Sequence, residues 1–443
     1  MGVMFQAFYW DCPVVENLEH EWWIEIKNRV PMLQQAGFTA LWLPPVSKAA
    51  SWKSMGYDPY DYYDLGEFDQ KGGKPTWFGS KSELLDLIQT AHAHGMQVYA
   101  DLVLNHNSGG DAQEQNPIDS KMRWTRFQPS SGKFARDSSC FHPSRYEQWD
   151  SATFEDMPDL CHRNPRVYSE LIEYARWLLE AISFDGFRYD MVKGYGGWMV
   201  RSIQELRSLR DDRAFKPYGV GECWERVREI EDWLNEANAW SDNPVSAFDF
   251  PLRDNLRDLC ESFGFSLRKL ERQPGTLLFD RPSQTVTFVE NHDIARNDPI
   301  LHDKMLAYAF ILTHEGYPCV FWQDYFNWNL AQEGNRQGIA ALVQVHEKYA
   351  AGATRILYVD DDLYVMQREG SGSQHGLVLV LNNRSTWNGV WVQTQWPNIQ
   401  FSPEAWCGSS DTAAPDSKWT DASGWAELWA PPRGYAVYVP QLS

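Results

Sequence analysis

The chain has 443 residues, more than a usual single domain, and its hydrophobic content of 43% is enough for one large core with smaller attachments. Its 60 acidic and 40 basic residues give a formal charge of −20, which argues against nucleic acid or an anionic membrane surface as a partner. A neutral substrate is therefore expected. The aromatic share of 14% provides rings that can stack on sugars, although most of them will lie in the core.

The seven cysteines are few for this length and odd in number, so they do not define a disulfide scaffold. We do not predict a bond between Cys140 and Cys161. No stretch reaches the roughly 18 apolar residues that a membrane helix needs. We expect a monomer that is secreted, with its export signal absent from this chain; a cytoplasmic location is the alternative.

In chain order, strand-like and helix-like runs alternate, which is typical of βα units around a parallel sheet. The first strand is expected at 4–10 and the second at 39–43. The amphipathic helix between them ends at Gly37, a common residue after the last turn of a helix. These elements form the first βα unit and the strand that begins the second.

Two later helices have clear start signals. Ser80 with Glu83 forms a capping-box pattern, and Asn164 precedes a helix that opens with Pro165. A strand passes through Asp101, and five more are expected at 184–189, 217–221, 246–250, 284–289 and 317–322. Eight βα units predict an α/β fold of the (β/α)8 TIM barrel type, in which the active site gathers at the C-terminal ends of the strands.

Two regions interrupt or follow the alternation. Residues 107–163 are polar and too long for a plain βα loop, so we expect an irregular subdomain inserted after the third strand. From 353 to 443 the pattern changes to short alternating runs, such as 362–367 and 435–439, which predict an antiparallel β-domain. The barrel would then comprise 1–106 and 164–352.

The stretch 184–194 ends an apolar run with Arg188 and Asp190. Residues two apart on a strand share a face, where the guanidinium can hold the carboxylate ionised. A surface ion pair is the simpler interpretation of these two residues alone. Three further apolar runs end in polar, chemically capable residues, at 98–106, 218–224 and 285–293.

These four stretches, in this order and spacing, resemble the four motifs of the α-amylase family of glycoside hydrolases, glycoside hydrolase family 13. The pattern is most similar to bacterial and plant α-amylases. The resemblance implies that 107–163 is domain B and that 353–443 is domain C, a β-sandwich. It also implies retaining endo-hydrolysis of α-1,4-glucosidic bonds in starch and maltooligosaccharides through a covalent glycosyl-enzyme intermediate.

Glycosidases use two carboxyl groups, one acting on the anomeric carbon and one protonating the leaving oxygen. Asp190 fits the nucleophile because Arg188 keeps it charged. Glu222 fits the general acid, since it follows an apolar strand and precedes Trp224, surroundings that raise the pKa of a carboxyl group. The resemblance adds Asp293 as the carboxylate that stabilises the transition state.

The resemblance also implies residues that contact the sugar. Tyr57, in the stretch 56–65, matches a residue that stacks on the sugar being cleaved, and Lys193 matches one on the leaving-group side. Two histidines, His106 and His292, are also implied, and either of them could instead be an ordinary core residue. The implied substrate contacts are Tyr57, His106, Arg188, Lys193, Trp224 and His292.

Finally, the resemblance implies a Ca²⁺ ion between the inserted subdomain and the barrel. Calcium prefers about 6–8 oxygen ligands. Asn105 and Asp159 match family ligands, and Asp150 with the carbonyl of Thr153 is a further pair by spacing. Many members have histidine where Gly194 stands, but its carbonyl can serve equally well. Capping of loop turns is the simpler role for either aspartate alone.

Two alternatives to a starch-cleaving enzyme remain open at this point. One is a relative that acts on short maltooligosaccharides, cyclodextrins or pullulan, or that favours transglycosylation. The other is an inactive sugar-binding or scaffold protein on the same fold. Trp322 stands where many members have tyrosine, a second departure from the family pattern. The intact set Asp190, Glu222 and Asp293 argues against an inactive protein.

Overall fold

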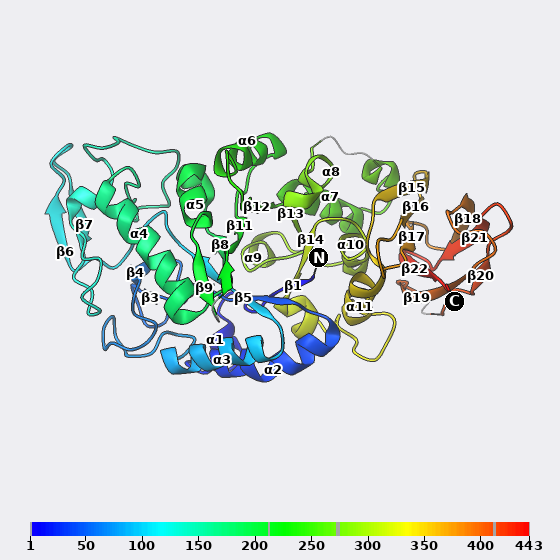
Figure 1. Cartoon of the computed structure of the whole chain (residues 1–443), viewed down its shortest axis with the longest axis horizontal. Coiled ribbons are helices and arrows are strands. Elements are labelled where there is room, and N and C mark those ends of the chain that lie inside the picture. The colour runs from blue at the N-terminus through cyan, green and yellow to red at the C-terminus, as the bar shows by residue number, and fades with distance from the viewer. Residues whose placement is uncertain (1, 211–212, 272–274, 411–412, 443) are drawn as a thin grey trace. The chain divides into compact units, whose positions relative to one another are not determined.

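The computed structural model describes residues 2–210, 213–271, 275–410 and 413–442. Parallel strands close into a barrel in the order β1, β14, β13, β12, β11, β8, β5, β2. This confirms the predicted TIM barrel. Figure 1 labels β5, β8, β11, β12, β13 and β14 among these strands. The barrel strands are β1 (Met4–Gln6), β2 (Ala40–Trp42), β5 (Gln97–Leu102), β8 (Gly186–Tyr189), β11 (Tyr218–Gly221), β12 (Ser246–Phe248), β13 (Thr285–Phe288) and β14 (Tyr317–Phe321).

The longer helices begin and end where local chemistry predicts. The Ser80 side chain accepts from the Glu83 N–H while Glu83 accepts from the Ser80 N–H, a complete capping box, and the Asn164 side chain accepts from the Arg166 N–H. Gly37 follows the second helix with φ 108°, which favours glycine. These helices are α2 (Trp22–Ala36), α3 (Lys81–Ala93), α4 (Pro165–Trp177), α5 (Gly197–Gln204), α6 (Val227–Ala237), α7 (Phe250–Glu261), α10 (Lys304–Ile311) and α11 (Ile339–Tyr349).

Shorter elements occupy the connections between these strands and helices. Two five-residue π-helical turns, Leu178–Ile182 and Gln323–Asn327, follow α4 and β14. In the described part of the chain, no helix combines the length and the apolar character needed to cross a membrane. The short elements are α1 (Cys12–Val15), α8 (Leu277–Asp280), α9 (Ile294–Asn297), β3 (Lys48–Ala49), β4 (Pro59–Asp61), β9 (Ser208–Arg210) and β10 (Arg213–Phe215).

The chain forms two compact units. One comprises Met1–Gln6, Gln35–Thr39 and Asp249–Ser443, and the other comprises Ala7–Gln34 and Ala40–Phe248. The second unit carries the barrel strands β2, β5, β8, β11 and β12. The same unit carries the long excursion between β5 and α4.

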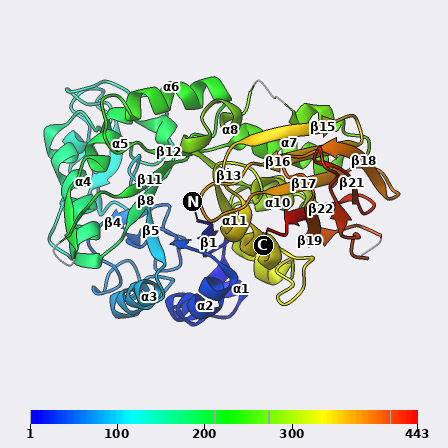
Figure 2. The same cartoon turned by 45° about the vertical axis from the view of Figure 1, so that its right-hand side comes forward.

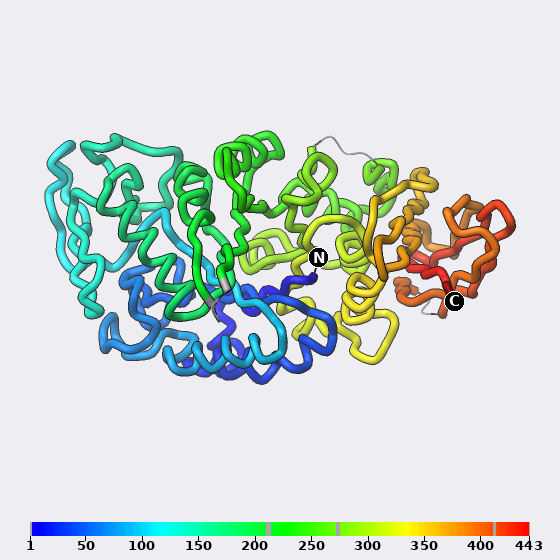
Figure 3. Tube along the Cα trace, viewed as in Figure 1, coloured from blue at the N-terminus to red at the C-terminus, as the bar shows by residue number. Residues whose placement is uncertain are grey.

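That excursion is mostly irregular, as predicted for 107–163, and Figure 3 traces it in cyan and teal. It contains one antiparallel pair, β6 (Ala112–Gln115) with β7 (Met122–Arg126). The last part of the excursion, which leads back to α4 and is called the returning arm, forms two isolated bridges, His106 with Asp159 and Phe141 with Leu160. The first bridge joins the arm to His106, four residues beyond the end of β5. The limits of the inserted domain stay a prediction.

The C-terminal part of the first unit is antiparallel, as predicted. A six-stranded sheet has the order β15-β16-β17-β22-β19-β20, and β18 pairs with β21 (Figure 2). Side chains from both sheets, such as Val365, Val380 and Leu428, form one buried core. The domain boundary at 353 stays a prediction. The strands are β15 (Thr354–Val359), β16 (Leu363–Arg368), β17 (Leu377–Asn382), β18 (Asn388–Gln393), β19 (Gln400–Cys407), β20 (Lys418–Trp419), β21 (Trp425–Ala430) and β22 (Gly434–Pro440).

Candidate active site

The register of three neighbouring strands sets the geometry of the site. Arg188 on β8 lies opposite Asp101 on β5, and Tyr189 at the end of β8 lies opposite Gly221 at the end of β11. Asp190 and Glu222 each follow one of these last residues, and the Glu222 N–H donates to the Tyr189 carbonyl at 2.9 Å. The two carboxylates therefore leave adjacent strands at the same level.

A single buried guanidinium holds three carboxylates. Arg188 Nη1 lies 2.7 Å from Asp101 Oδ1 and 2.7 Å from Asp190 Oδ1, while Nη2 lies 2.9 Å from Glu222 Oε2. The Arg188 side chain is 1% exposed. The predicted pairing of Arg188 with Asp190 is thus part of a buried charge cluster. A surface ion pair, the simpler interpretation, is excluded.

Burial and charge oppose one another in this cluster. Burial alone would lower the pKa of Arg188, but Asp101, Glu222 and Asp190 together raise it well above its usual range. Burial raises the pKa of Asp101, and Arg188 opposes that change. The arginine is therefore charged at every working pH, and it supplies the positive charge that the carboxylates need.

The surroundings of Glu222 differ from the expectation. Sequence reasoning placed this carboxyl group among apolar neighbours, yet Arg188 contacts it and the Met191 N–H donates to Glu222 Oε2 at 3.0 Å. Trp224 is 44% exposed. The strand before Glu222 is apolar, but the residues that meet its carboxylate come from β8 and the turn after it, which the local sequence of β11 does not reveal.

Tyr57 lies beside the charge cluster. Its hydroxyl donates to Asp101 Oδ2 at 2.8 Å, and its ring stacks on Trp10 with centroids 5.9 Å apart and planes 13° apart. Trp42 also donates to Asp101, at 3.1 Å. A pair of stacked, partly exposed rings next to two carboxylates is a suitable platform for a sugar ring.

His106 is buried and positions the loop that carries Tyr57. His106 Nε2 lies 2.8 Å from the Tyr57 carbonyl oxygen, and the imidazole stacks on Phe154 at 4.7 Å. Burial lowers the pKa of His106 to about 4, so its ring is neutral near pH 7. Because Nε2–H donates to the protein backbone here, the predicted contact of His106 with the sugar stays a prediction.

Lys193 is placed differently from the other predicted substrate contacts. It is exposed and pairs with Glu225, with Nζ 3.1 Å from Oε1. His292 and Asp293 follow β13 in the other compact unit. There, His292 Nδ1 lies 3.0 Å from the Gln6 side-chain amide, and His292 Nε2 lies 3.2 Å from Asp293 Oδ2. The contacts of these three residues with substrate stay predictions.

The predicted calcium ligands form a second polar cluster, just beyond β5. Asn105 Oδ1 and both carboxylate oxygens of Asp150 and Asp159 are buried and lack a hydrogen-bond partner among the described residues. Burial and the nearby Asp150 raise the pKa of Asp159. A Cβ atom added to Gly194 would lie 1.9 Å from Asn105 Oδ1, so that backbone approaches the amide closely. Unsatisfied buried oxygens suit a hard cation.

Sequence reasoning missed four residues around these clusters. The sequence places Asp101 within the stretch 98–106 without giving it a role, but in the structure its carboxylate accepts hydrogen bonds from Arg188, Tyr57 and Trp42. The Ala152 carbonyl, next to the predicted Thr153, lies 3.1 Å from the Cβ position of Gly194. His142 and Cys161 lie beside the acidic pair. The spacing of His142 and Cys161 from the two aspartates matches no recognisable metal-binding pattern in the sequence. The bridge between Phe141 and Leu160 is needed to bring these residues together.

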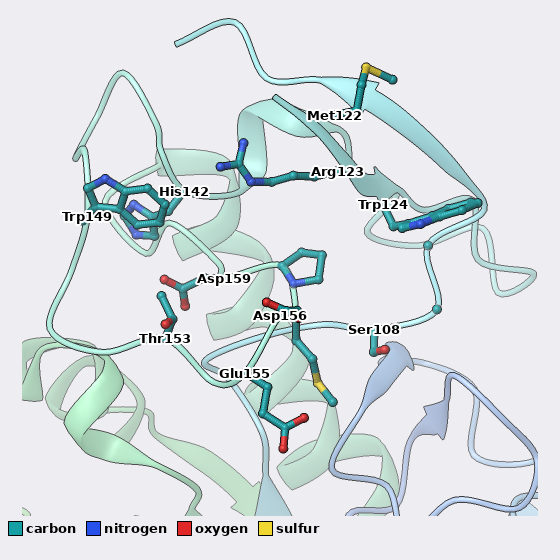
Figure 4. Close-up of a pocket in the computed structure, with 14 residues that line it drawn as sticks. Ser108, Met122, Arg123, Trp124, His142, Trp149, Thr153, Glu155, Asp156 and Asp159 are labelled. Carbon is teal, nitrogen blue, oxygen red and sulfur yellow. The ribbon is translucent and has the colours of Figure 1, made fainter. Parts of the chain in front are cut away.

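A cavity of about 890 Å³ opens over the second cluster within the inserted segment. Figure 4 shows the His142 ring beneath Trp149 and the Asp159 carboxylate beside Thr153. The two aromatic rings of His142 and Trp149 are stacked, 6.2 Å apart. The wall on the other side carries Trp124 from β7, which is 53% exposed.

A closed barrel with carboxylates at the ends of neighbouring strands is the architecture of a TIM-barrel glycoside hydrolase. The family model for the α-amylase catalytic domain matches residues 23–326, and the α-amylase C-terminal model matches residues 377–439. The chain therefore belongs to the α-amylase family, and it is a glycoside hydrolase.

Individual relatives agree with this assignment. An α-amylase of Geobacillus stearothermophilus is 31% identical, with 99% of this chain and 87% of the relative covered. The cytoplasmic α-amylase of Escherichia coli K12 is 27% identical over 86% of this chain and 88% of that protein. Among solved structures, the Geobacillus thermoleovorans α-amylase complexed with acarbose has a TM-score of 0.69 at 20% identity, covering 100% of this chain and 98% of the other.

Proposed function

We propose that this chain is an α-amylase, which hydrolyses internal α-1,4-glucosidic bonds of starch and related glucans with retention of configuration. The observation that carries the proposal is the Arg188 cluster, in which one buried cation binds both Asp190 and Glu222. Two carboxylates held by one guanidinium are close enough to act on one glycosidic bond. Family membership supplies the substrate class.

In the first step, the Asp190 carboxylate attacks the anomeric carbon. The bond from that carbon to the leaving oxygen breaks, and Glu222 in its acid form gives its proton to that oxygen. Arg188 and Asp101 keep Asp190 oriented before and after the attack. Asp293, from the end of β13, is proposed to bind sugar hydroxyls in the transition state.

In the second step, water attacks the same carbon while Glu222, now a carboxylate, takes a proton from the water. The bond to Asp190 breaks, and both carboxyl groups return to their starting states. Tyr57 and Trp10 are proposed to hold the ring of the cleaved sugar by stacking. His106, Lys193, Trp224 and His292 are proposed to bind the remaining hydroxyls.

The experiment is digestion of soluble starch, followed by three readouts. Internal cleavage lowers viscosity and iodine staining much faster than it creates reducing ends. Freshly released products should be α-anomers, as detected by proton NMR before mutarotation. Products that appear only one or two units from chain ends would overturn the endo mode, β-anomers would overturn retention, and absence of cleavage would favour a sugar-binding protein.

We further propose that Asn105, Asp150, Asp159 and the carbonyls of Thr153 and Gly194 hold a Ca²⁺ ion. The unpartnered buried oxygens of Asn105, Asp150 and Asp159 support this proposal. The close approach of Gly194 to Asn105 supports its carbonyl as a ligand, and Ala152 offers another carbonyl nearby. Bound calcium would supply positive charge and would link β5 to the returning arm of the inserted segment.

The remaining proposals concern the protein's surroundings. We propose that it is secreted and acts as a monomer on starch and maltooligosaccharides. Its relatives include a cytoplasmic α-amylase of Escherichia coli, so family membership does not decide between the two locations. Fractionation of the producing cells and light scattering of the purified chain test these two proposals directly.

A further inference from the structure

Three potential ligands of a second kind lie beside the acidic pair. One ligand atom each from His142, Glu147 and Cys161 lies within 4.8 Å of the others. The bridge between Phe141 and Leu160 brings these residues together, because the His142 N–H donates to the Asp159 carbonyl and the Cys161 N–H to the Cys140 carbonyl. His142 and Glu147 are five residues apart in the sequence, and the fold brings Cys161 to them.

The imidazole of His142 is oriented as a metal ligand. Its Nδ1 lies 3.1 Å from the Glu147 carbonyl oxygen and 3.3 Å from the Gln148 carbonyl oxygen, so Nδ1 carries the proton and donates it. Its Nε2 is buried, without a hydrogen-bond partner among the described residues, and lies 3.4 Å from Asp150 Oδ2. Metal-binding histidines are typically fixed in this way by a carbonyl at the other nitrogen.

The thiol of Cys161 lies beside the His142 imidazole. Cys161 is fully buried, and a ring nitrogen of His142 lies within 4.8 Å of its sulfur. Cys140 is equally buried on the neighbouring arm but belongs to neither metal-ligand group found among the described residues. Both cysteines are free thiols. Only one of two adjacent buried cysteines therefore meets a histidine and a carboxylate.

This set of one nitrogen, one sulfur and one carboxylate differs in kind from the calcium ligands. Calcium takes oxygen ligands, whereas Zn²⁺ prefers four ligands drawn from cysteine, histidine and carboxylate. We propose that His142 Nε2, Cys161 Sγ and the Glu147 carboxylate bind Zn²⁺, with water or Asp150 in the fourth position. Asp150 contacts His142 and is also a proposed calcium ligand, so the two ions would be neighbours.

The first test is zinc binding by the full chain after chelation and return of saturating calcium. Calorimetric titration with Zn²⁺ should give one site per chain. Cys161→Ser should weaken that site by more than about 100-fold, since loss of an outer-shell partner alone typically costs 10–100-fold. Cys140→Ser is the matched control and should bind like the wild type. Equal weakening in both variants, or in neither, would overturn the proposal.

A second test uses the wild type alone and does not depend on the folding of a variant. X-ray absorption of the zinc-loaded protein should show a sulfur neighbour at about 2.3 Å and nitrogen or oxygen neighbours at about 2.0–2.2 Å. With Co²⁺ in place of zinc, a thiolate-to-metal charge-transfer band should appear. A zinc shell without sulfur, or a Cys140–Cys161 disulfide in protein isolated without reductant, would overturn the proposal.

Discussion

The two polar clusters of the second compact unit are built from similar residues but are balanced differently. Around Arg188, a guanidinium from the chain itself binds Asp101, Asp190 and Glu222. Around Asp159, two carboxylates and an amide oxygen are buried without hydrogen-bond partners among the described residues. Asp101 of the first cluster lies on β5, and Asn105 of the second follows it by four residues, just beyond the end of that strand.

The difference shows how each cluster obtains its positive charge. An internal arginine is covalently part of the fold, so Asp190 and Glu222 are oriented as soon as the barrel forms. The second cluster holds two carboxylates, and the His142 imidazole lies beside one of them, 3.4 Å from Asp150 Oδ2. Because neighbouring buried carboxylates repel one another, a cation from solution would stabilise this cluster further. The first cluster should therefore respond mainly to mutation and the second to metal concentration and pH.

The largest expected effect is on turnover at the first cluster. Asp190→Asn and Glu222→Gln should each lower kcat on soluble starch at least about 10³-fold, because each removes an interaction made in the transition state. Thermal unfolding should show that both variants remain folded. Asp86→Asn on the exposed face of α3 is a control and should keep normal turnover. Near-normal kcat in either active-site variant would refute the assigned role.

The next effect concerns the internal cation itself. Arg188→Gln should lower the free energy of unfolding by about 3–5 kcal/mol, since it leaves buried carboxylates unpaired. Arg384→Gln removes an exposed ion pair with Asp362 and should cost about 0–1 kcal/mol. Denaturant titration at pH 7 measures both. Similar losses in the two variants would mean that the Arg188 cluster is not charge-balanced by its arginine.

At the second cluster, stability should depend on calcium. At a free concentration about 100 times Kd, the ion adds about 2.7 kcal/mol to the free energy of unfolding, so EDTA should lower Tm and calcium should restore it. Asp159→Ala should abolish this response. Asp156→Ala, an exposed acid of the same segment, should keep it. An unchanged melting curve after verified metal removal would exclude the calcium site.

The same cluster predicts a pH dependence in the metal-free protein. Burial and the nearby Asp150 raise the pKa of Asp159 to about 8, above the value of about 4 in an unfolded chain. A raised pKa contributes stability that is present below pH 4 and is lost as pH rises to 8. The difference in Tm between calcium and EDTA should therefore grow between pH 5 and 8. A constant difference would contradict this account, and Asp159→Asn should flatten the dependence.

The smallest effect is expected outside both clusters, in the C-terminal β-domain. Trp391 on β18 is 58% exposed, and no residue from 353 onward is proposed to act in catalysis. Trp391→Ala should leave kcat on short maltooligosaccharides unchanged. A folded variant with lost turnover would show that the domain contributes to the active site.

Local signals in the sequence predicted the elements well. The caps at Ser80 and Asn164 and the glycine at position 37 depend on neighbours a few residues away, so the sequence contains them. The pairing of Arg188 with Asp190 follows from strand period alone. Side-chain contacts across strands could not be predicted in this way, and Asp101 and the polar surroundings of Glu222 depend on the register of β5, β8 and β11.

The second cluster shows the same limit more strongly. Asn105, Asp150 and Asp159 were predicted from resemblance, but His142 and Cys161 were not, because they meet only through the bridge at Phe141. Their spacing of 19 residues matches no short metal-binding pattern. The ion pair of Lys193 with Glu225 could not be predicted either, because Glu225 follows β11, a different strand from the one that precedes Lys193.

The bridge between His106 and Asp159 joins the two clusters mechanically. Asp159 is a proposed metal ligand, His106 pairs with it through the backbone, and His106 Nε2 in turn holds the Tyr57 carbonyl. A shift of the returning arm would therefore displace the loop that carries Tyr57, the residue proposed to stack on the sugar. Partial loss of the ion should accordingly appear as a higher KM for starch at temperatures where the protein is still folded. Substrate binding should then weaken at a lower temperature than the one at which the protein unfolds.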